Sequence, residues 1–502
     1  MSSAEKDNAE PMTERSNLIE DFVDAVGKWH DFPDVMLRTG AYFILSTVLG
    51  PFFEFMDLPR ESLKPNVYFI LGSDPGLTHR SVFEEFVTRV LRERFIHNYW
   101  NKYRPAPPKE KKEDEDEDEK EEDPSPFVLV NEAVEVGDTN KEKRDFLTAL
   151  FEDYIIREAG SPEGMVDHIA EHKFNQYIFM GSEYGFTFEK IADPTSYLYG
   201  TISILDKAYY GEPYKAHYSM RGSNKMASRF MKSGIYFTML AMMQDPRLYL
   251  TEFLGRQGFL RRCSIVAIFT QDLDENKIKG PIMRGHSSLE SWLDEYAKKL
   301  DDIAIEYSKF ARLWIWIPEN VASAVNLQAI QRTKEVIQDA KRKGYSDIAG
   351  IARATEWEII LKLTALEAIA ECPEIHVSPT VNDGTLSLKM EHVQRATAFL
   401  DSIASNQKKV YDALAEKTLR LDADAKFKAK CERVISWLGE KYNPNDPEQE
   451  RTRGTYAKKF KWVDSEKVIS NLLSAGSVVQ ITDNTTGGRP AQRLYLAKDV
   501  PK

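Results

Sequence analysis

A glycine-containing loop between an apolar run and an amphipathic segment is the first feature that can do chemistry. Residues 66–71 (NVYFIL) form a bounded run rich in strand formers, and GSDPGLTHRS (72–81) follows at once. Apolar residues then recur at helical spacing at Phe83, Phe86, Val87, Val90 and Phe95. Backbone N–H groups in such a loop, together with the N-terminus of the next helix, can enclose an anion. The order strand, loop, helix therefore predicts a phosphate-binding loop.

The loop differs from the standard phosphate-loop pattern G-x-x-x-x-G-K-[ST]. No lysine precedes Ser81, and Gly72 lies two residues too far from it. The Ser81 hydroxyl is the group expected to hold Mg²⁺, and Arg80 must supply the cation for the terminal phosphates. Arginine pairs with phosphate through two nitrogens but is bulkier than lysine. A Gly-Pro surface turn between strand and helix is the alternative interpretation.

Two further strand-like runs end or begin beside charged residues. The run Tyr177–Met180 leads to Glu183, which can polarise an attacking water, although Ser182 stands where an aspartate usually helps to hold Mg²⁺. GFLRRC (258–263) precedes the apolar run SIVAIF, so Arg261 or Arg262 can act as an arginine finger across a subunit interface. The alternatives are an exposed glutamate at a strand end and a surface arginine pair.

The last 78 residues are basic, although the whole chain carries a net charge of −12. Residues 425–502 hold 15 basic and 9 acidic side chains. Their pattern is a helix, a basic connector RTRGTYAKKFKW (451–462), a second helix over 464–475, and two short strands joined by TDNTTGGRPAQ, which resembles a winged helix. Its cations can neutralise DNA phosphates. These are Arg451, Arg453, Lys458, Lys459, Lys461, Lys467, Arg489 and Arg493. Because the second helix carries a single cation, backbone contacts are favoured over base reading, and a winged helix used for protein contacts is the alternative.

Five segments in this order resemble a domain-of-unknown-function P-loop ATPase family of phages, plasmids and archaea, regarded as helicase-like replication proteins. They are PNVYFILGSDPGLTHRS, GSPEGMVDHIAEH, IFMGSEYGF, GFLRR and RATEWEIILKLTALEAIAE, within residues 30–400. The resemblance implies a RecA/AAA+-like P-loop NTPase core of class α/β with a parallel sheet. It implies ATP and Mg²⁺ as cofactors, with Gly72, Gly76, Thr78, His79, Arg80 and Ser81 around the phosphates. It favours Glu183 as the catalytic base, Arg262 as the interface arginine, and Thr238 or Gln244 as the γ-phosphate sensor.

The motifs and the resemblance indicate two possible functions, and a competing motif suggests a third. The first is an ATPase of a mobile element or archaeal replication system that couples hydrolysis to DNA unwinding or translocation, as a homo-oligomer for which a hexameric ring is one form. The second is a non-catalytic DNA-binding scaffold or replication initiator, which the missing lysine and aspartate motivate. The third is a zinc peptidase, because His168 and His172 fit H-x-x-E-H. We expect no zinc, since no third ligand is evident.

The composition bounds the location and the domains. Three cysteines without a C-x-x-C pair exclude a disulfide framework. Neither a secretory signal nor a membrane span is visible in the sequence. We therefore expect a cytoplasmic, nucleoid-associated protein with no membrane partner.

Residues 104–126 combine prolines with 11 acidic residues and predict a disordered insert. An acidic decoy that competes with DNA for a basic surface is the alternative. The predicted divisions are an N-terminal arm and helix (1–30), an ATPase-like core (31–285), a helical domain (286–424) and a winged helix (425–502).

Overall fold

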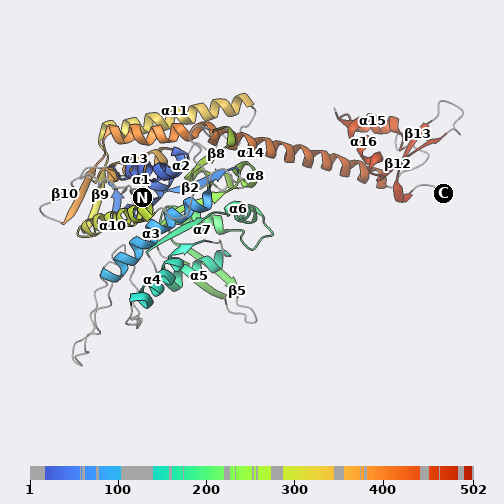
Figure 1. Cartoon of the computed structure of the whole chain (residues 1–502). Helices are drawn as coiled ribbons and strands as arrows, with labels where there is room; N and C mark the ends of the chain where they lie inside the picture. Colours follow the sequence, from blue (N-terminus) through green and yellow to red (C-terminus); the bar gives the residue numbers. More distant parts are fainter. Residues whose placement is uncertain are drawn as a thin grey trace, which may run out of the picture. The chain divides into compact units, whose positions relative to one another are not determined.

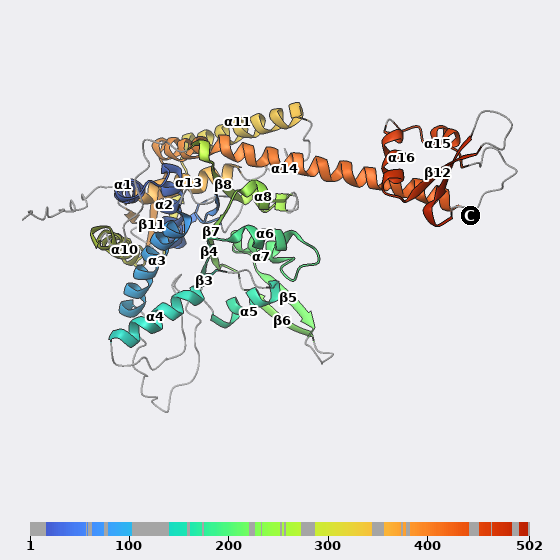
Figure 2. The ribbon, with the colours of Figure 1, turned by 45° about the vertical axis from the view of Figure 1, so that its right-hand side comes forward.

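The computed structural model divides the chain into two compact units, Met1–Leu414 and Ala415–Lys502 (Figures 1 and 2). It describes residues 17–499 except 57, 59–62, 75–78, 103–139, 158–160, 173–174, 220–225, 232, 252–253, 256–257, 273–286, 344–355, 373–374, 378–381, 441–450, 463 and 484–490. The predicted insert 104–126 and the arm before residue 17 therefore lie outside the described residues. Among the described helices, none is both long and apolar enough to span a bilayer.

A five-stranded parallel sheet is the centre of the first unit. Its order is β3-β4-β7-β2-β8, from β2 (Tyr68–Ser73), β3 (Ile155–Ile156), β4 (Gln176–Gly181), β7 (Tyr236–Met243) and β8 (Cys263–Ile268). Every residue of these strands is buried, as expected for a parallel sheet covered on both faces. The three apolar runs that the sequence predicted as strands correspond to β2, β4 and β8. The mixed α/β class with a parallel sheet is thereby confirmed.

The connections of this sheet reverse direction between β2 and β7. The chain leaves β2 toward β3 at one edge, and it leaves β7 toward β8 at the other edge. In open parallel sheets, ligands bind outside the carboxyl ends of the strands at such a switch point. We therefore expect a ligand site among the residues that follow β2, β4 and β7.

Helices and one hairpin surround the sheet. They are α3 (Arg80–Lys102), α4 (Asn140–Tyr154), α5 (Pro162–His172), α6 (Tyr184–Ala192), α7 (Thr201–Tyr209), the short α8 (Pro246–Tyr249), and the antiparallel pair β5 (Tyr214–Ser219) and β6 (Met226–Met231). The hairpin lies beside α5, whereas α6 and α7 lie against β7 (Figures 1 and 2). Two N-terminal helices, α1 (Leu18–Trp29) and α2 (Asp34–Val48), complete this part, and α2 packs across β2, β7 and β8.

The predicted start of the first helix at Leu18 is confirmed. Asn17 caps α1 by accepting hydrogen bonds from the backbone N–H groups of Ile19 and Glu20. The predicted apolar face, from Leu18 to Val26, is buried, and the Tyr296 hydroxyl donates to the Leu18 carbonyl. This helix is therefore part of the first unit's core.

A second sheet crosses the region that the sequence predicted as helical. Its order is β1-β9-β11-β10, from β1 (Phe53–Phe55), β9 (Arg312–Trp316), β10 (His376–Val377) and β11 (Asp383–Ser387). It lies among α10 (Ser287–Tyr307), α11 (Glu319–Lys343), α13 (Glu356–Ala370) and α14 (Met390–Gly439). Because β1 pairs with β9, the N-terminal segment and the predicted helical domain share one unit. In that unit, α11 lies alongside the first half of α14 (Figures 1 and 2), where Arg332 bonds to Asp401.

The second unit is a small helical module with a hairpin. It contains the last part of α14, α15 (Arg453–Lys459), α16 (Ser465–Ser474), and the antiparallel strands β12 (Val478–Asp483) and β13 (Ala491–Leu496). An isolated bridge joins Thr452 to Arg493, so the strand pair continues to the start of α15. A buried core that includes Trp437, Tyr456 and Phe460 unites these elements. The second helix and both strands match the sequence prediction, but the expected connector contains a helix, which a capping box at Thr452 begins.

Candidate functional site

The carboxyl end of β2 has no room for a side chain at Gly72. A Cβ atom placed there would lie 2.3 Å from Cδ of Pro246, the first residue of α8. The backbone then leaves the sheet at Asp74, whose carboxylate accepts hydrogen bonds from the N–H (2.9 Å) and hydroxyl (2.7 Å) of Thr270. The Thr270 hydroxyl holds the pKa of Asp74 below its ordinary value. Asp74 therefore fixes the loop's start to the segment after β8.

The loop re-enters the described chain at His79. This residue has a φ of 44°, a left-handed conformation that is unusual outside glycine, and α3 begins directly after it. His79 and Ser81 are exposed, and Arg80 is half-buried between them. Gly76 and Thr78, which the resemblance placed around the phosphates, lie outside the described residues.

Arg80 and Glu183 are brought together at this edge. The Arg80 Nη2 atom lies 3.7 Å from Glu183 Oε1, and its Nη1 donates to the Ser182 carbonyl at 3.5 Å. Burial lowers the pKa of Arg80, and the charge of Glu183 opposes that shift. The side chain of Arg80 is 11% exposed and that of Glu183 is 66% exposed. A guanidinium that is this desolvated and has one exposed carboxylate partner is well suited to receive an anion.

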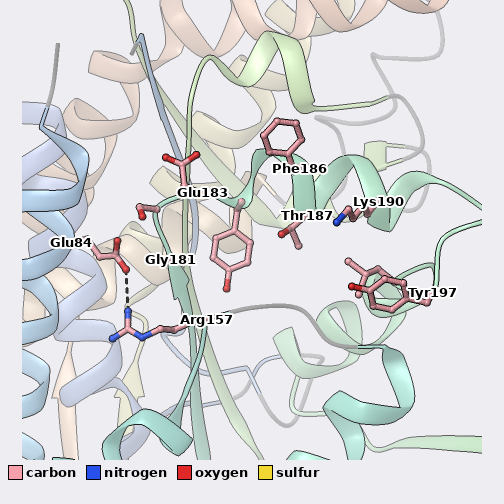
Figure 3. Close-up of a pocket in the computed structure, with 11 residues that line it drawn as sticks. Glu84, Arg157, Gly181, Glu183, Phe186, Thr187, Lys190 and Tyr197 are labelled. Carbon is pink, nitrogen blue, oxygen red and sulfur yellow. Dashed lines mark hydrogen bonds and ion pairs between the residues drawn. The ribbon is translucent and has the colours of Figure 1, made fainter. Parts of the chain in front are cut away.

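Beside Glu183 is a cavity of about 350 Å³ (Figure 3). Its walls come from the end of β4, from α6 and the segment after it, from α3 and from the segment after β3. The lining residues are Glu84, Arg157, Gly181, Ser182, Glu183, Tyr184, Phe186, Thr187, Lys190, Tyr197 and Leu198. Gly181 is needed at the strand end, because a Cβ there would lie 2.8 Å from the ring of Tyr184. The hydroxyl of Tyr184 donates to the Ile156 carbonyl and thereby fixes the first turn of α6 to β3.

Arg157 is a site residue that the sequence analysis missed. It follows β3, and its guanidinium bonds to Glu84 of α3 at 3.1 Å and to Glu152 at 2.9 Å. The hydrogen bond that Arg157 donates to the Glu152 carboxylate raises the pKa of Arg157. The strand β3 has two residues, so no apolar run in the sequence marks the position of Arg157.

Arg262 lies at the opposite edge of the sheet from Glu183. It precedes β8, and its Nη1 donates to the Gly258 carbonyl at 2.7 Å and lies 3.1 Å from Asp206 Oδ1. Burial raises the pKa of Asp206 to about 6, against the opposing charge of Arg262. The described structure therefore does not bring Arg262 and Glu183 together within one chain.

The two sensor candidates occupy different places on β7. The Thr238 hydroxyl is buried and lies 3.0 Å from the hydroxyl of Thr47. Gln244 follows the last residue of β7 at the carboxyl edge, and its Oε1 accepts from the Tyr249 hydroxyl at 3.5 Å. Of the pair, Gln244 is the residue that shares an edge with Glu183.

The proposed DNA-binding cations of the second unit fall into two groups. Arg451 is buried over the Trp437 ring at 4.5 Å, Arg453 pairs with Glu466 at 2.6 Å, and Arg493 is half-buried on β13. The exposed group is Lys458, Lys459, Lys461 and Lys467. Arg489 lies outside the described residues. The exposed lysines are therefore the groups best presented to a polyanion, and the arginines that are described help to build the fold.

The zinc motif gives no assembled ligand set in the part of the chain that the structure describes. The Nε2 of His168 lies 2.7 Å from the Asp153 carbonyl, and its ring packs against Tyr177. The side chains of Glu171 and His172 lie outside the described residues. No group of three or more His, Cys, Asp or Glu side chains suited to a metal gathers among those described.

Comparison with known proteins adds no relative: no protein-family model and no curated protein matches this chain.

Proposed function

We propose that the first unit is a nucleotide-hydrolysing core of the helicase-like P-loop ATPase type, and that the second unit is a winged helix that binds DNA. The observation that carries the proposal is the meeting of Arg80 and Glu183, 3.7 Å apart, at the carboxyl edge of the sheet beside its switch point. Arg80 follows the glycine-containing loop after β2, and Glu183 follows β4. The sequence interpretation requires these two positions to converge on one phosphate.

Two features of the described part of the loop support phosphate binding. The absence of a side chain at Gly72 keeps the backbone close-packed where β2 ends, and the 23-residue helix α3 begins at Arg80, so its N-terminal N–H groups favour an anion. Ser81, in the first turn of α3, is the residue that would hold Mg²⁺, whose chemistry there is to neutralise charge on the phosphate oxygens.

In this mechanism Arg80 exchanges its contact with Glu183 for the terminal phosphate. That exchange leaves the Glu183 carboxylate, which is mostly exposed, able to orient and deprotonate a water. Gln244 is the group at the same edge that can sense the terminal phosphate. Arg262 acts in trans from a neighbouring copy in a homo-oligomer, which requires it to leave Asp206.

DNA binding is assigned to the exposed lysines of the second unit. Lys458 and Lys459 follow each other at the end of α15, and Lys467 stands on α16. Because they are exposed ammonium groups, phosphate contacts rather than base contacts are expected. ATP-dependent unwinding or translocation of DNA in a mobile-element or replication system is the activity that unites the two units.

A non-catalytic DNA-binding scaffold is the second candidate. The observation that favours it is the same ion pair, because Arg80 replaces the usual lysine and already contacts the carboxylate that hydrolysis needs. In this candidate the pair is a permanent structural contact and the fold is kept without turnover.

The test is ATP hydrolysis with Mg²⁺, measured with and without single-stranded DNA. We expect DNA-stimulated turnover in the wild type and a loss of roughly 100-fold or more in Glu183→Gln, the usual size of a general-base effect. Arg80→Ala should lose turnover as well, whereas Glu189→Gln, an exposed glutamate on the same helix α6, should keep it. A wild type that binds DNA without turnover would replace the motor with the scaffold.

A further inference from the structure

The cavity beside Glu183 carries aromatic rings that the mechanism above does not use. Phe186 is 61% exposed and Tyr197 is 68% exposed, and both line the cavity. In Figure 3, Phe186, Thr187 and Lys190 follow one another along α6, and Tyr197 lies next to Lys190. Single exposed aromatic residues need no explanation, but two on the wall of one cavity mark a binding surface.

The ring of Phe186 packs against Tyr249 and is otherwise largely exposed. It meets the ring of Tyr249 edge-on, with centroids 5.4 Å apart and planes at 68°. Tyr249 packs in turn against Gly185, where a Cβ would lie 2.8 Å from that ring. This backing holds Phe186 in place while most of its surface stays exposed, which is the arrangement of a stacking platform.

Polar groups on the same wall suit a nucleotide unit. Lys190 is four residues after Phe186, so both lie on one face of α6, and Thr187 lines the same cavity. Proteins that hold single strands combine aromatic rings, which stack on bases of any sequence, with cations for the phosphates. A volume of about 350 Å³ is within the range of small-ligand sites and accommodates one nucleotide.

We propose that this cavity binds single-stranded nucleic acid, with one base stacked on Phe186, Lys190 toward the adjoining phosphate, and Tyr197 stacked on the next base of the strand. The inference rests on the proposed ATPase and gives it a second DNA contact, in the first unit. Glu183 is the N-cap of α6 and Phe186 lies in its first turn. A base stacked on Phe186 therefore acts on the helix that begins at the water-activating carboxylate, which provides a physical route for DNA to stimulate hydrolysis.

The experiment compares the binding of a short oligothymidine with that of an abasic strand of equal length, by fluorescence anisotropy with the full chain. Phe186→Ala and Tyr197→Ala should each weaken oligothymidine binding about tenfold, the effect of losing one stacked base, and leave the abasic strand unchanged. Tyr197→Phe keeps a ring and should bind as the wild type does. Trp316→Ala removes an aromatic residue that is 49% exposed on β9, away from the cavity, and should have no effect.

If the alanine variants lost affinity equally for oligothymidine and for the abasic strand, or lost none for either, the inference would be overturned. A raised KM for ATP in the alanine variants with unchanged oligothymidine affinity would assign the cavity to the base of the mononucleotide, which also overturns it. The proposed function is judged separately, by turnover in the wild type. Normal turnover with ring-independent DNA binding removes only this inference, and ring-dependent binding without turnover removes only the ATPase.

Discussion

Replacing Gly72 by alanine should destabilise the carboxyl edge of the sheet, because the added methyl collides with α8. Its Cβ would lie 2.3 Å from Pro246 Cδ and 2.7 Å from Cγ, against about 3.5–4.0 Å for an ordinary carbon contact. A proline ring cannot rotate away, and the Asp245 side chain holds α8 by accepting from the Arg247 N–H at 2.9 Å. The backbone must therefore shift to relieve the clash, so we expect the free energy of unfolding to fall by about 1–3 kcal/mol.

A double-mutant cycle with Pro246→Ala isolates this collision. Removal of Cγ and Cδ takes away the two closest contacts and leaves Pro246 Cβ at 3.2 Å, so the double variant should recover much of the lost stability. The assay is hydrogen exchange measured on peptides that cover β2 and β7, which reports the local free energy of opening. Gly164→Ala is the control, because its Cβ would meet nothing closer than 3.4 Å and alanine is favoured within a helix. Costs for Gly72→Ala and Pro246→Ala that add within about 0.3–0.5 kcal/mol would refute the collision.

Two further predictions concern charge. The raised pKa of Asp206, about 6, means that the folded protein binds its proton more tightly than the unfolded chain does, so this group's stabilising contribution is lost as pH rises from about 4 to 6. Asp206→Asn, which can still accept from Arg262, should flatten that part of the profile of urea midpoint against pH, and parallel profiles would contradict the assignment. Lys458→Gln and Lys459→Gln should each reduce the slope of log K against log salt for single-stranded DNA by roughly 0.7. Lys309→Gln, an exposed lysine of the first unit, should leave that slope unchanged, and a slope insensitive to all three changes would remove α15 from the interface.

Three strands of the main sheet, β2, β4 and β8, were predictable because a strand that is buried on both faces forms an uninterrupted apolar run in the sequence. The strands β3 and β7 were not predicted. Residues 66–71 gave β2, and the run ending at Met180 gave β4. The second sheet left no such signal. In β9 only Leu313 and Ile315 are buried, and five residues of this kind between long amphipathic helices are indistinguishable from a helix turn.

The sequence was sufficient to predict two charged residues of the site, but not the contacts that other site residues make with distant parts of the chain. Glu183 and Arg80 stand at strand and helix ends that the sequence marks, so their edge of the sheet followed from the parallel topology. Arg157 and Asp74 could not be found, because their roles depend on contacts with Glu84 and Thr270 from other elements. The helix α15 was missed because its cations and aromatic residues suggested a connector, whereas Tyr456 and Phe460 are one turn apart in the core of the second unit.

The order of the strands in the sheet also determines when each strand can pair during synthesis of the chain. The strand β2 lies between β7 and β8, so Tyr68 meets its partner Met239 only after about 170 further residues have been made. At about 5–20 residues per second, that interval is roughly ten to thirty seconds. Throughout it, the apolar segment Tyr68–Leu71 has no strand to pair with. We therefore expect nascent chains halted before β7 to be the form that aggregates and that holding chaperones bind, whereas chains released after β8 escape both.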